Sequence, residues 1–230
     1  MMKISFTIYH FIVLSWYIFL NYFISLQEED TRKSFIFQDG GKWKYLTFLN
    51  LFLQAIFYGI ACLEDVLKGI KGKKHITFVT ALRDRLFTTL VFPISTFVFL
   101  TFWIIFLYDR ELIYPKDLDN VFPVWLNHAM HTLILPLSFV EIFQRPHSYL
   151  SKKKGLSFLS VACLSYMGRI TWLYSKTGTW VYPVFSKLSP LSIAAFFFLS
   201  YIFIIGIYVF GETLNFWKWG EVIQPKKKRK

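Results

Sequence analysis

The largely apolar segment 43–63 carries three uncharged polar side chains at helical spacing. Thr47, Asn50 and Gln54 are spaced i, i+3 and i+7. That spacing places all three on one face of a helix. Polar groups are costly in hydrocarbon, so such a face is expected to point into a protein interior, where it often marks function.

The segment 121–143 has a second polar face. The run 127-NHAMHT-132 places Asn127 and His131 four residues apart, and His128 and His131 three apart. Residues at these separations are neighbours on a helix surface. A buried imidazole accepts or donates a proton near neutral pH, which makes the histidines the strongest candidates for chemistry.

A hydroxyl and an imidazole on different helices, with amides nearby, are the groups that acyl transfer needs. Thr47 would attack a carbonyl carbon and His131 would take its proton. The N–H groups of Asn50 and Asn127 are candidates for stabilising the oxyanion. No acidic side chain falls at the depth of His131, so we expect a dyad. Whether His128 assists His131 or only packs stays open.

One basic residue, Arg169, lies inside the apolar run 166-YMGRITWLY-174. Its expected depth in the bilayer is that of Thr47 and His131, so it is a candidate for holding a substrate carboxylate. The alternative is that Arg169 only extends to the lipid headgroups. A lipid ester is the natural substrate for such a site, because it can enter sideways from the bilayer.

Each of these residues also has a structural interpretation. An isolated threonine in a membrane helix commonly packs or bonds to its own backbone, and amides hold helices together. His128 and His131 are two ligands on one side of a helix, but a catalytic zinc usually takes three. We therefore expect no metal and no cofactor. A G-x-S-x-G elbow is absent from the sequence, which disfavours an α/β-hydrolase.

The composition is that of a membrane protein. Of the 230 residues, 55% are hydrophobic and 21% aromatic, and the mean hydropathy is +0.43. The net charge is +12, yet only 17% of residues are charged, so the basic residues are few and clustered. That distribution is not the one expected of a nucleic-acid binder. Cys62 and Cys163 read as small buried hydrophobes.

The hydropathy pattern predicts an all-α polytopic membrane protein with six transmembrane helices, because each span needs about 20 apolar residues. The predicted spans are 4–26, 43–63, 86–108, 121–143, 156–174 and 190–210, followed by a basic tail, 221–230. The loops leave no room for a soluble domain, so 1–230 is read as a single six-helix membrane domain. The first span is interpreted as a retained signal anchor.

Most of the 26 basic residues fall on the side of the membrane that holds both ends of the chain. The positive-inside rule therefore predicts cytoplasmic N- and C-termini. The tail 225-PKKKRK-230 is interpreted as an orientation determinant near anionic membrane lipids. We expect a multi-pass protein of the cell membrane. The endoplasmic reticulum membrane is the alternative, because Lys227 and Lys228 are spaced like a dilysine retrieval signal.

The whole sequence resembles the androgen-induced protein family of six-helix membrane proteins. The matching stretches are 8-IYHFIVLSWYIFLNYFIS-25, 42-KWKYLTFLNLFLQAIFYG-59, 114-YPKDLDNVFPVWLNHAMHT-132, 145-RPHSY-149, 177-TGTWVYPVF-185 and 215-NFWKWG-220. The resemblance implies a threonine hydrolase that cleaves fatty-acid esters of hydroxy fatty acids. It also implies that Thr47, in KYLTF, is the nucleophile and that His131, the second histidine of NHAMH, is the base.

Two other classes compete with a hydrolase. The first is a non-enzymatic membrane regulator, whose polar faces hold the bundle together or contact a membrane-protein partner. The second is a transporter, which would have paired interrupted helices near the midplane. Pro93 and Pro136 permit kinks, but the sequence has no paired Gly/Pro interruptions.

Overall fold

The computed structural model describes residues 4–30, 37, 40–71 and 76–223, and every regular element within them is a helix. The α-helices are α1 (Ile4–Asp30), α2 (Leu46–Lys71), α3 (Thr77–Leu86), α4 (Phe92–Asp109), α5 (Val124–His131), α6 (Ile134–Gln144), α7 (Lys152–Thr177), α8 (Pro183–Ser186) and α9 (Pro190–Ile223). Shorter turns are η1 (Lys42–Lys44), η3 (Phe87–Val91), η4 (Arg110–Leu112) and η5 (Lys116–Asn120).

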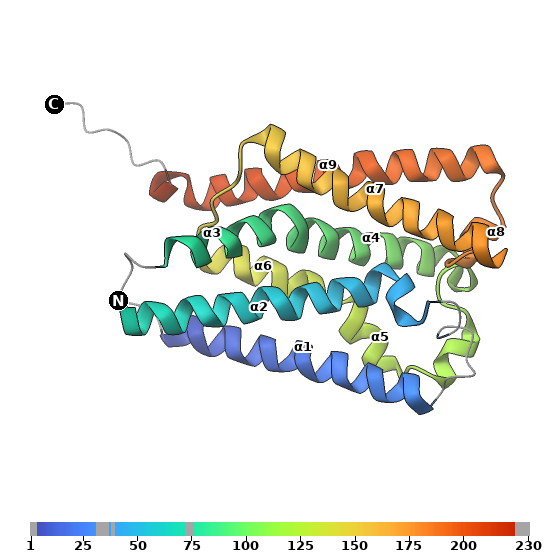
Figure 1. The fold of residues 1–230 in the computed structure, drawn as a ribbon, viewed down its shortest axis with the longest axis horizontal. Helices are drawn as coiled ribbons and strands as arrows, with labels where there is room; N and C mark the ends of the chain where they lie inside the picture. The colour runs from blue at the N-terminus through green and yellow to red at the C-terminus, as the bar shows by residue number, and fades with distance from the viewer. Residues whose placement is uncertain (1–3, 31–36, 38–39, 72–75, 224–230) are drawn as a thin grey trace.

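Five stretches of the described chain are long and apolar enough to cross a membrane: Phe6–Gln27, Leu46–Ile70, Thr77–Leu112, Lys152–Thr177 and Pro190–Glu221. Their helices run along the long axis of one bundle, and α1 begins at the end of the bundle where α9 finishes (Figure 1). The fold is therefore an all-α membrane bundle. The cytoplasmic location of both termini stays a prediction.

The predicted span 121–143 is not one continuous helix. It divides into α5 and α6, with Thr132 and Leu133 between them. Pro136 explains the break, because it has no N–H and its ring clashes with the carbonyl of Thr132 in a regular helix. From the start of α5 to the end of α6 the pair would span roughly 30 Å at 1.5 Å per residue, about the thickness of the hydrocarbon core. The pair is thus the candidate for a sixth crossing.

A second proline shapes the predicted span 86–108. Pro93 is the second residue of α4, and the five residues before α4 form a π-helical turn, η3. Since Pro93 cannot donate to the carbonyl of Thr89, the backbone widens there instead of breaking. As a result α3, η3 and α4 form one long helix, which extends beyond the predicted span at its start.

The remaining helices also extend past the predicted bounds. The spans predicted at 4–26, 43–63, 156–174 and 190–210 correspond to α1, α2, α7 and α9. The start of α2 is later than predicted because η1 forms a separate turn before it. The first residues of the predicted tail belong to α9, and 224–230 lie outside the described residues.

A buried group of charged side chains joins the helices at the end of the bundle where α1 begins. His10 of α1 contacts Asp65 of α2 at 2.6 Å and Glu141 of α6 at 3.0 Å. Arg145, just after α6, bonds to Glu64 at 2.8 Å and to Asp65 at 3.0 Å. Buried charges are tolerated only when they are paired in this way. The group fixes the ends of α1, α2 and α6 against one another. The sequence pattern did not predict it.

Candidate active site

The structure brings Thr47 and His131 into contact. The hydroxyl oxygen Oγ1 of Thr47 lies 3.1 Å from Nε2 of His131. Thr47 is the second residue of α2, and His131 is the last residue of α5, immediately before the proline-induced break. The hydroxyl and the imidazole therefore converge from two different helices, which is the arrangement that an activated nucleophile and its base require.

The hydrogen bonds of His131 fix which nitrogen carries the proton. Nδ1 lies 2.7 Å from Oδ1 of Asn127 and 3.1 Å from the Asn127 backbone carbonyl oxygen. A carbonyl oxygen only accepts hydrogen bonds, so Nδ1 must donate. This assignment does not depend on which way the Asn127 amide is turned. Nε2 is then left with its lone pair facing the Thr47 hydroxyl, and it can accept the hydroxyl proton.

Asn127 therefore lies behind the imidazole, on the opposite side from Thr47. The sequence predicts this residue as a candidate oxyanion donor, and it predicts a dyad without a third member. In the structure its amide oxygen orients the base, so the arrangement is Thr47–His131–Asn127. The spacing of four residues between Asn127 and His131 indicates, from the sequence alone, that their side chains are neighbours on the helix. Phe102 of α4 adds a second restraint, because its ring stacks on the imidazole with centroids 3.5 Å apart and planes 4° from parallel.

Two helix ends meet at the site and favour the charges that acyl transfer would create. The start of α2 carries partial positive charge and unpaired N–H groups, which stabilise an anion. The backbone N–H groups of Thr47 and Phe48 have no backbone acceptor among the described residues. The end of α5 carries partial negative charge, which stabilises a protonated His131. The candidate oxyanion donors are thus backbone groups, which sequence reasoning did not consider.

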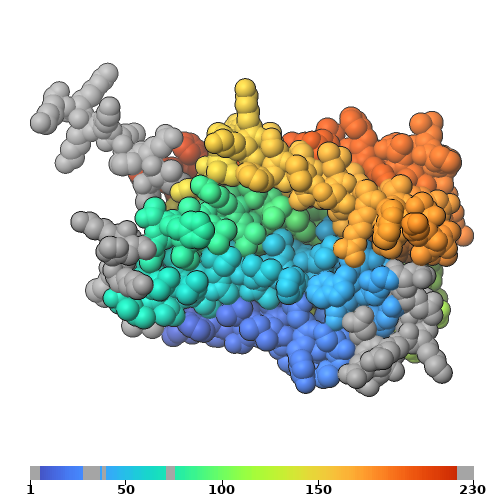
Figure 2. All heavy atoms as spheres, in the orientation of Figure 1, coloured from blue at the N-terminus to red at the C-terminus, as the bar shows by residue number. Residues whose placement is uncertain are grey.

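Two tyrosines hold the start of α2 in place. The N–H of Leu46 donates to the Tyr182 hydroxyl at 3.0 Å, and the hydroxyls of Tyr182 and Tyr166 lie 2.7 Å apart. Tyr166 in turn donates to the carbonyl of Lys44 at 3.1 Å. On the face shown in Figure 2, α7 and α8 lie against the first turns of α2. Burial raises the pKa of Tyr182, so it stays a neutral hydroxyl in this network.

The other predicted site residues lie elsewhere. Asn50 is buried one turn below Thr47, where its Oδ1 accepts from Ser95 of α4 at 3.2 Å. It does not line the cavity described below, although its Nδ2 has no partner among the described residues. Gln54, on the same face of α2, also donates to Ser95. This polar face joins α2 to α4.

His128 and Arg169 are both exposed, and neither lines the cavity that holds Thr47 and His131. His128 is exposed, bonds to Thr132 at 3.0 Å and stacks on Trp103. Arg169 is exposed on α7 and does not line the cavity. The expected shared depth of Arg169 and His131 did not bring them together, because a helix presents only part of its circumference to its neighbours. The alternative, that Arg169 extends to the lipid headgroups, stays a prediction.

The Thr47–His131 pair lies on an apolar cavity of about 180 Å³. Both Thr47 and His131 are part of its wall. Most other lining side chains are apolar and come from α4, α7 and α9, including Ile94, Phe97 and Ile204. No Lys, Arg, Asp or Glu of the described residues lines it. Such a cavity suits a hydrocarbon chain with one reactive polar group.

Among the described residues, no three His, Cys, Asp or Glu side chains are grouped so that they could hold a metal ion. The His128 ring contacts Thr132 and Trp103. The polar groups identified at the site are a hydroxyl, an oriented imidazole and backbone N–H groups.

The fold and the site define a polytopic helical membrane protein with a threonine–histidine pair on an apolar cavity. Residues 5–216 match the model of the family described as FAR-17a/AIG1-like protein. The chain belongs to this family. No solved structure matches it.

Three relatives show how far the similarity extends. The human androgen-dependent TFPI-regulating protein is 64% identical over 230 residues, covering 100% of both chains. The human androgen-induced gene 1 protein is 38% identical over 187 residues, covering 78% of this chain and 79% of the relative. A Schizosaccharomyces pombe protein named as a UPF0641 membrane protein is 24% identical over 175 residues, covering 74% and 73%.

Proposed function

We propose that this protein is a membrane-embedded threonine hydrolase that cleaves fatty-acid esters of hydroxy fatty acids to a fatty acid and a hydroxy fatty acid. The observation that carries the proposal is the 3.1 Å contact between Thr47 Oγ1 and His131 Nε2. It lies in the wall of an apolar cavity. The substrate class is the one that the sequence resemblance implies, and a lipid ester matches the apolar lining.

In the first step the lone pair of His131 Nε2 takes the Thr47 proton while Oγ1 attacks the ester carbonyl carbon. The resulting oxyanion is held by the N–H groups of Thr47 and Phe48 at the start of α2. The protonated imidazole then gives its proton to the alcohol oxygen of the hydroxy fatty acid as the carbon–oxygen bond breaks. The products of this step are the free hydroxy fatty acid and an acyl ester on Thr47.

In the second step His131 Nε2 takes a proton from water, and the hydroxide oxygen attacks the acyl carbon. The proton returns to Thr47 Oγ1 as the acyl–oxygen bond breaks, which releases the fatty acid. Asn127 holds the Nδ1 proton throughout, so the ring keeps its Nε2 toward the reaction. The sequence of steps consumes one water and needs no cofactor.

The substrate would come from the bilayer, and the surrounding membrane lipids would contact the exposed apolar side chains of α7 and α9. We place the protein in the cell membrane, with the endoplasmic reticulum membrane as the alternative and both termini in the cytoplasm. The competing function is a non-enzymatic membrane regulator of a partner protein. The name of the human androgen-dependent TFPI-regulating protein favours that class.

Hydrolysis by the purified protein in detergent separates the two functions. We expect the wild type to cleave such esters and to react with a fluorophosphonate probe, and Thr47→Ala to do neither. Thr47→Ser, which keeps a hydroxyl, should retain both, and Thr171→Ala on the exposed side of α7 is the matched control. No hydrolysis by the folded wild type would refute the proposal and favour the regulator. Turnover by correctly folded Thr47→Ala at the wild-type rate would refute Thr47 as the nucleophile.

A further inference from the structure

The cavity continues well past the catalytic pair toward the middle of the bundle. Phe102 stacks on His131 and so marks the depth of the reaction. Ile94 also lines the cavity and lies roughly 12 Å farther along α4 at 1.5 Å per residue. We call this part the deep branch. Its walls are Ile94, Phe97 and Val98 of α4, Ala162 and Cys163 of α7, and Phe197, Ser200 and Ile204 of α9.

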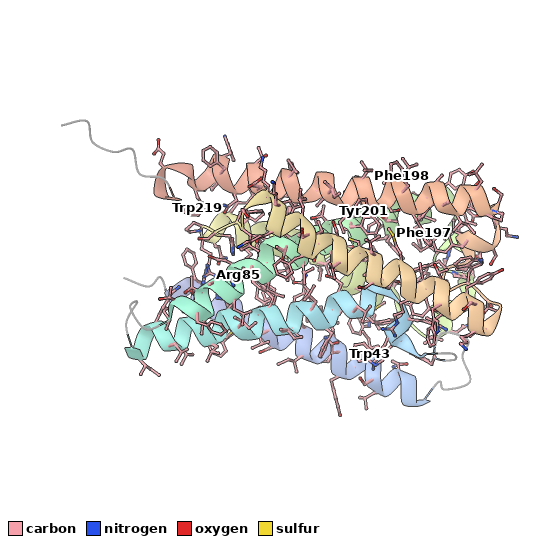
Figure 3. All side chains as sticks on the ribbon, turned by 45° about the horizontal axis from the view of Figure 1, so that its top comes forward. Trp43, Arg85, Phe197, Phe198, Tyr201 and Trp219 are labelled. Atoms are coloured by element: carbon pink, nitrogen blue, oxygen red, sulfur yellow. The ribbon has the colours of Figure 1, made fainter. Side chains whose placement is uncertain are left out.

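The far end of the deep branch is closed by packed side chains. Ile204, Leu159 and Tyr208 form a buried cluster, with relative exposures of 5%, 1% and 1%. Ile94 and Phe97 pack against that cluster. The hydroxyls of Ser160 and Tyr201, 2.7 Å apart, join α7 to α9 nearby. Figure 3 shows Phe198 on the outer side of α9, away from the side on which Phe197 lies.

The lining determines which half of an ester can occupy a closed branch. No charged side chain of the described residues lines it, and Ser200 brings one hydroxyl. An ionised carboxylate is very costly to bury without a partner, so the half that carries a free carboxylate is excluded. A plain hydrocarbon chain gains from leaving water or lipid headgroups for such a lining.

We propose that the deep branch is an acyl-chain site, and that Ala162 sets the chain length accepted there. The acid half of the ester lies in the closed branch while the carboxylate-bearing hydroxy acid stays toward the opening. This inference rests on the proposed function for its ester, but the hydrocarbon site itself does not require hydrolysis. The order of release supports it, because the half bound to Thr47 must stay while the alcohol half leaves.

Ala162 is the smallest side chain in the wall of the deep branch. It lies on α7 one turn deeper than Tyr166, which contacts the start of α2. One helical turn corresponds to about 5–6 Å, so Ala162 falls near the middle of the branch. A phenylalanine there would fill the space that the outer half of a long chain needs. A short acyl chain would still fit between Ala162 and Thr47.

The test is an ester series with one alcohol half and acyl chains from short to long. For Ala162→Phe we expect kcat/KM to fall about 10-fold or more for the long chains and to stay within about 3-fold for the shortest. Ile94→Ala should shift the optimum to longer chains. Ala195→Phe, on the exposed side of α9, is the matched control and should leave the profile unchanged. An equal loss at every length, or no change in either variant, would overturn the proposal.

A binding readout separates this inference from the proposed hydrolysis. A fatty acid with a diazirine at its terminal carbon should label the deep-branch residues, and Thr47→Ala should label as well as the wild type. Ala162→Phe should lose that label. Labelling of the deep branch in a wild type that does not hydrolyse esters would refute the proposed function and support the acyl site. Labelling confined to the lipid-facing surface would refute the acyl site alone.

Discussion

Replacing Asn127 tests whether the orientation of the His131 ring, and with it the reaction rate, depends on the hydrogen bonds to Nδ1. Asn127→Leu keeps the size of the side chain and removes the 2.7 Å contact to Nδ1, while the backbone carbonyl at 3.1 Å remains. One hydrogen bond to a group that becomes charged contributes about 1.5–3 kcal/mol. Its loss in the transition state predicts a kcat lower by roughly 10- to 100-fold.

Two readouts distinguish this orienting role from a general loss of structure. KM should change little, since Asn127 does not line the cavity. The rate of fluorophosphonate labelling of Thr47 should fall by the same factor as kcat, because both reactions need the oriented base. Asn127→Asp, which restores an acceptor oxygen, should recover most of the rate. A folded Asn127→Leu protein with kcat within about 2-fold of the wild type would contradict this account.

Three further results are expected. His131→Ala should lower kcat by about 10²- to 10⁴-fold, as for a lost general base. The kcat of His128→Ala, on the exposed side of α5, should stay near that of the wild type. Equal losses of kcat in the two variants would contradict the assignment of His131 as the base. Tyr182→Phe should destabilise the fold by about 1 kcal/mol and slow labelling of Thr47, measured by thermal unfolding and probe kinetics. Glu141→Ala should cost about 3–5 kcal/mol of stability by leaving buried charges unpaired, and an unchanged melting temperature would count against a paired cluster.

The structure also changes how the fourth predicted span is understood. A run of apolar residues indicates a membrane helix, but it does not say whether the helix is continuous. Pro136 was recognised as permitting a kink, and the break four residues before it leaves His131 at a helix end. In a continuous helix, the backbone carbonyls around His131 would all accept hydrogen bonds within the helix. No helix terminus would then lie at the site.

Some properties follow from the sequence because they depend on local spacing. Long apolar runs predict a membrane protein whatever the packing, since the backbone must satisfy its hydrogen bonds within helices. Helical periodicity places Asn127 and His131 on one face of a single helix, and it groups Asn50 with Gln54 on another. Thr47 and His131 were identified by residue type and position together with the resemblance.

The tertiary structure decided the rest, because periodicity fixes faces within a helix and says nothing about the rotation of one helix against another. Only the packing turned Thr47 toward His131 and left His128 and Arg169 facing outward. It also gathered His10 and Glu141, which are far apart in the sequence, into one buried group. Contacts of this kind depend on the relative position and rotation of several helices. Packing and desolvation across the whole bundle determine that arrangement.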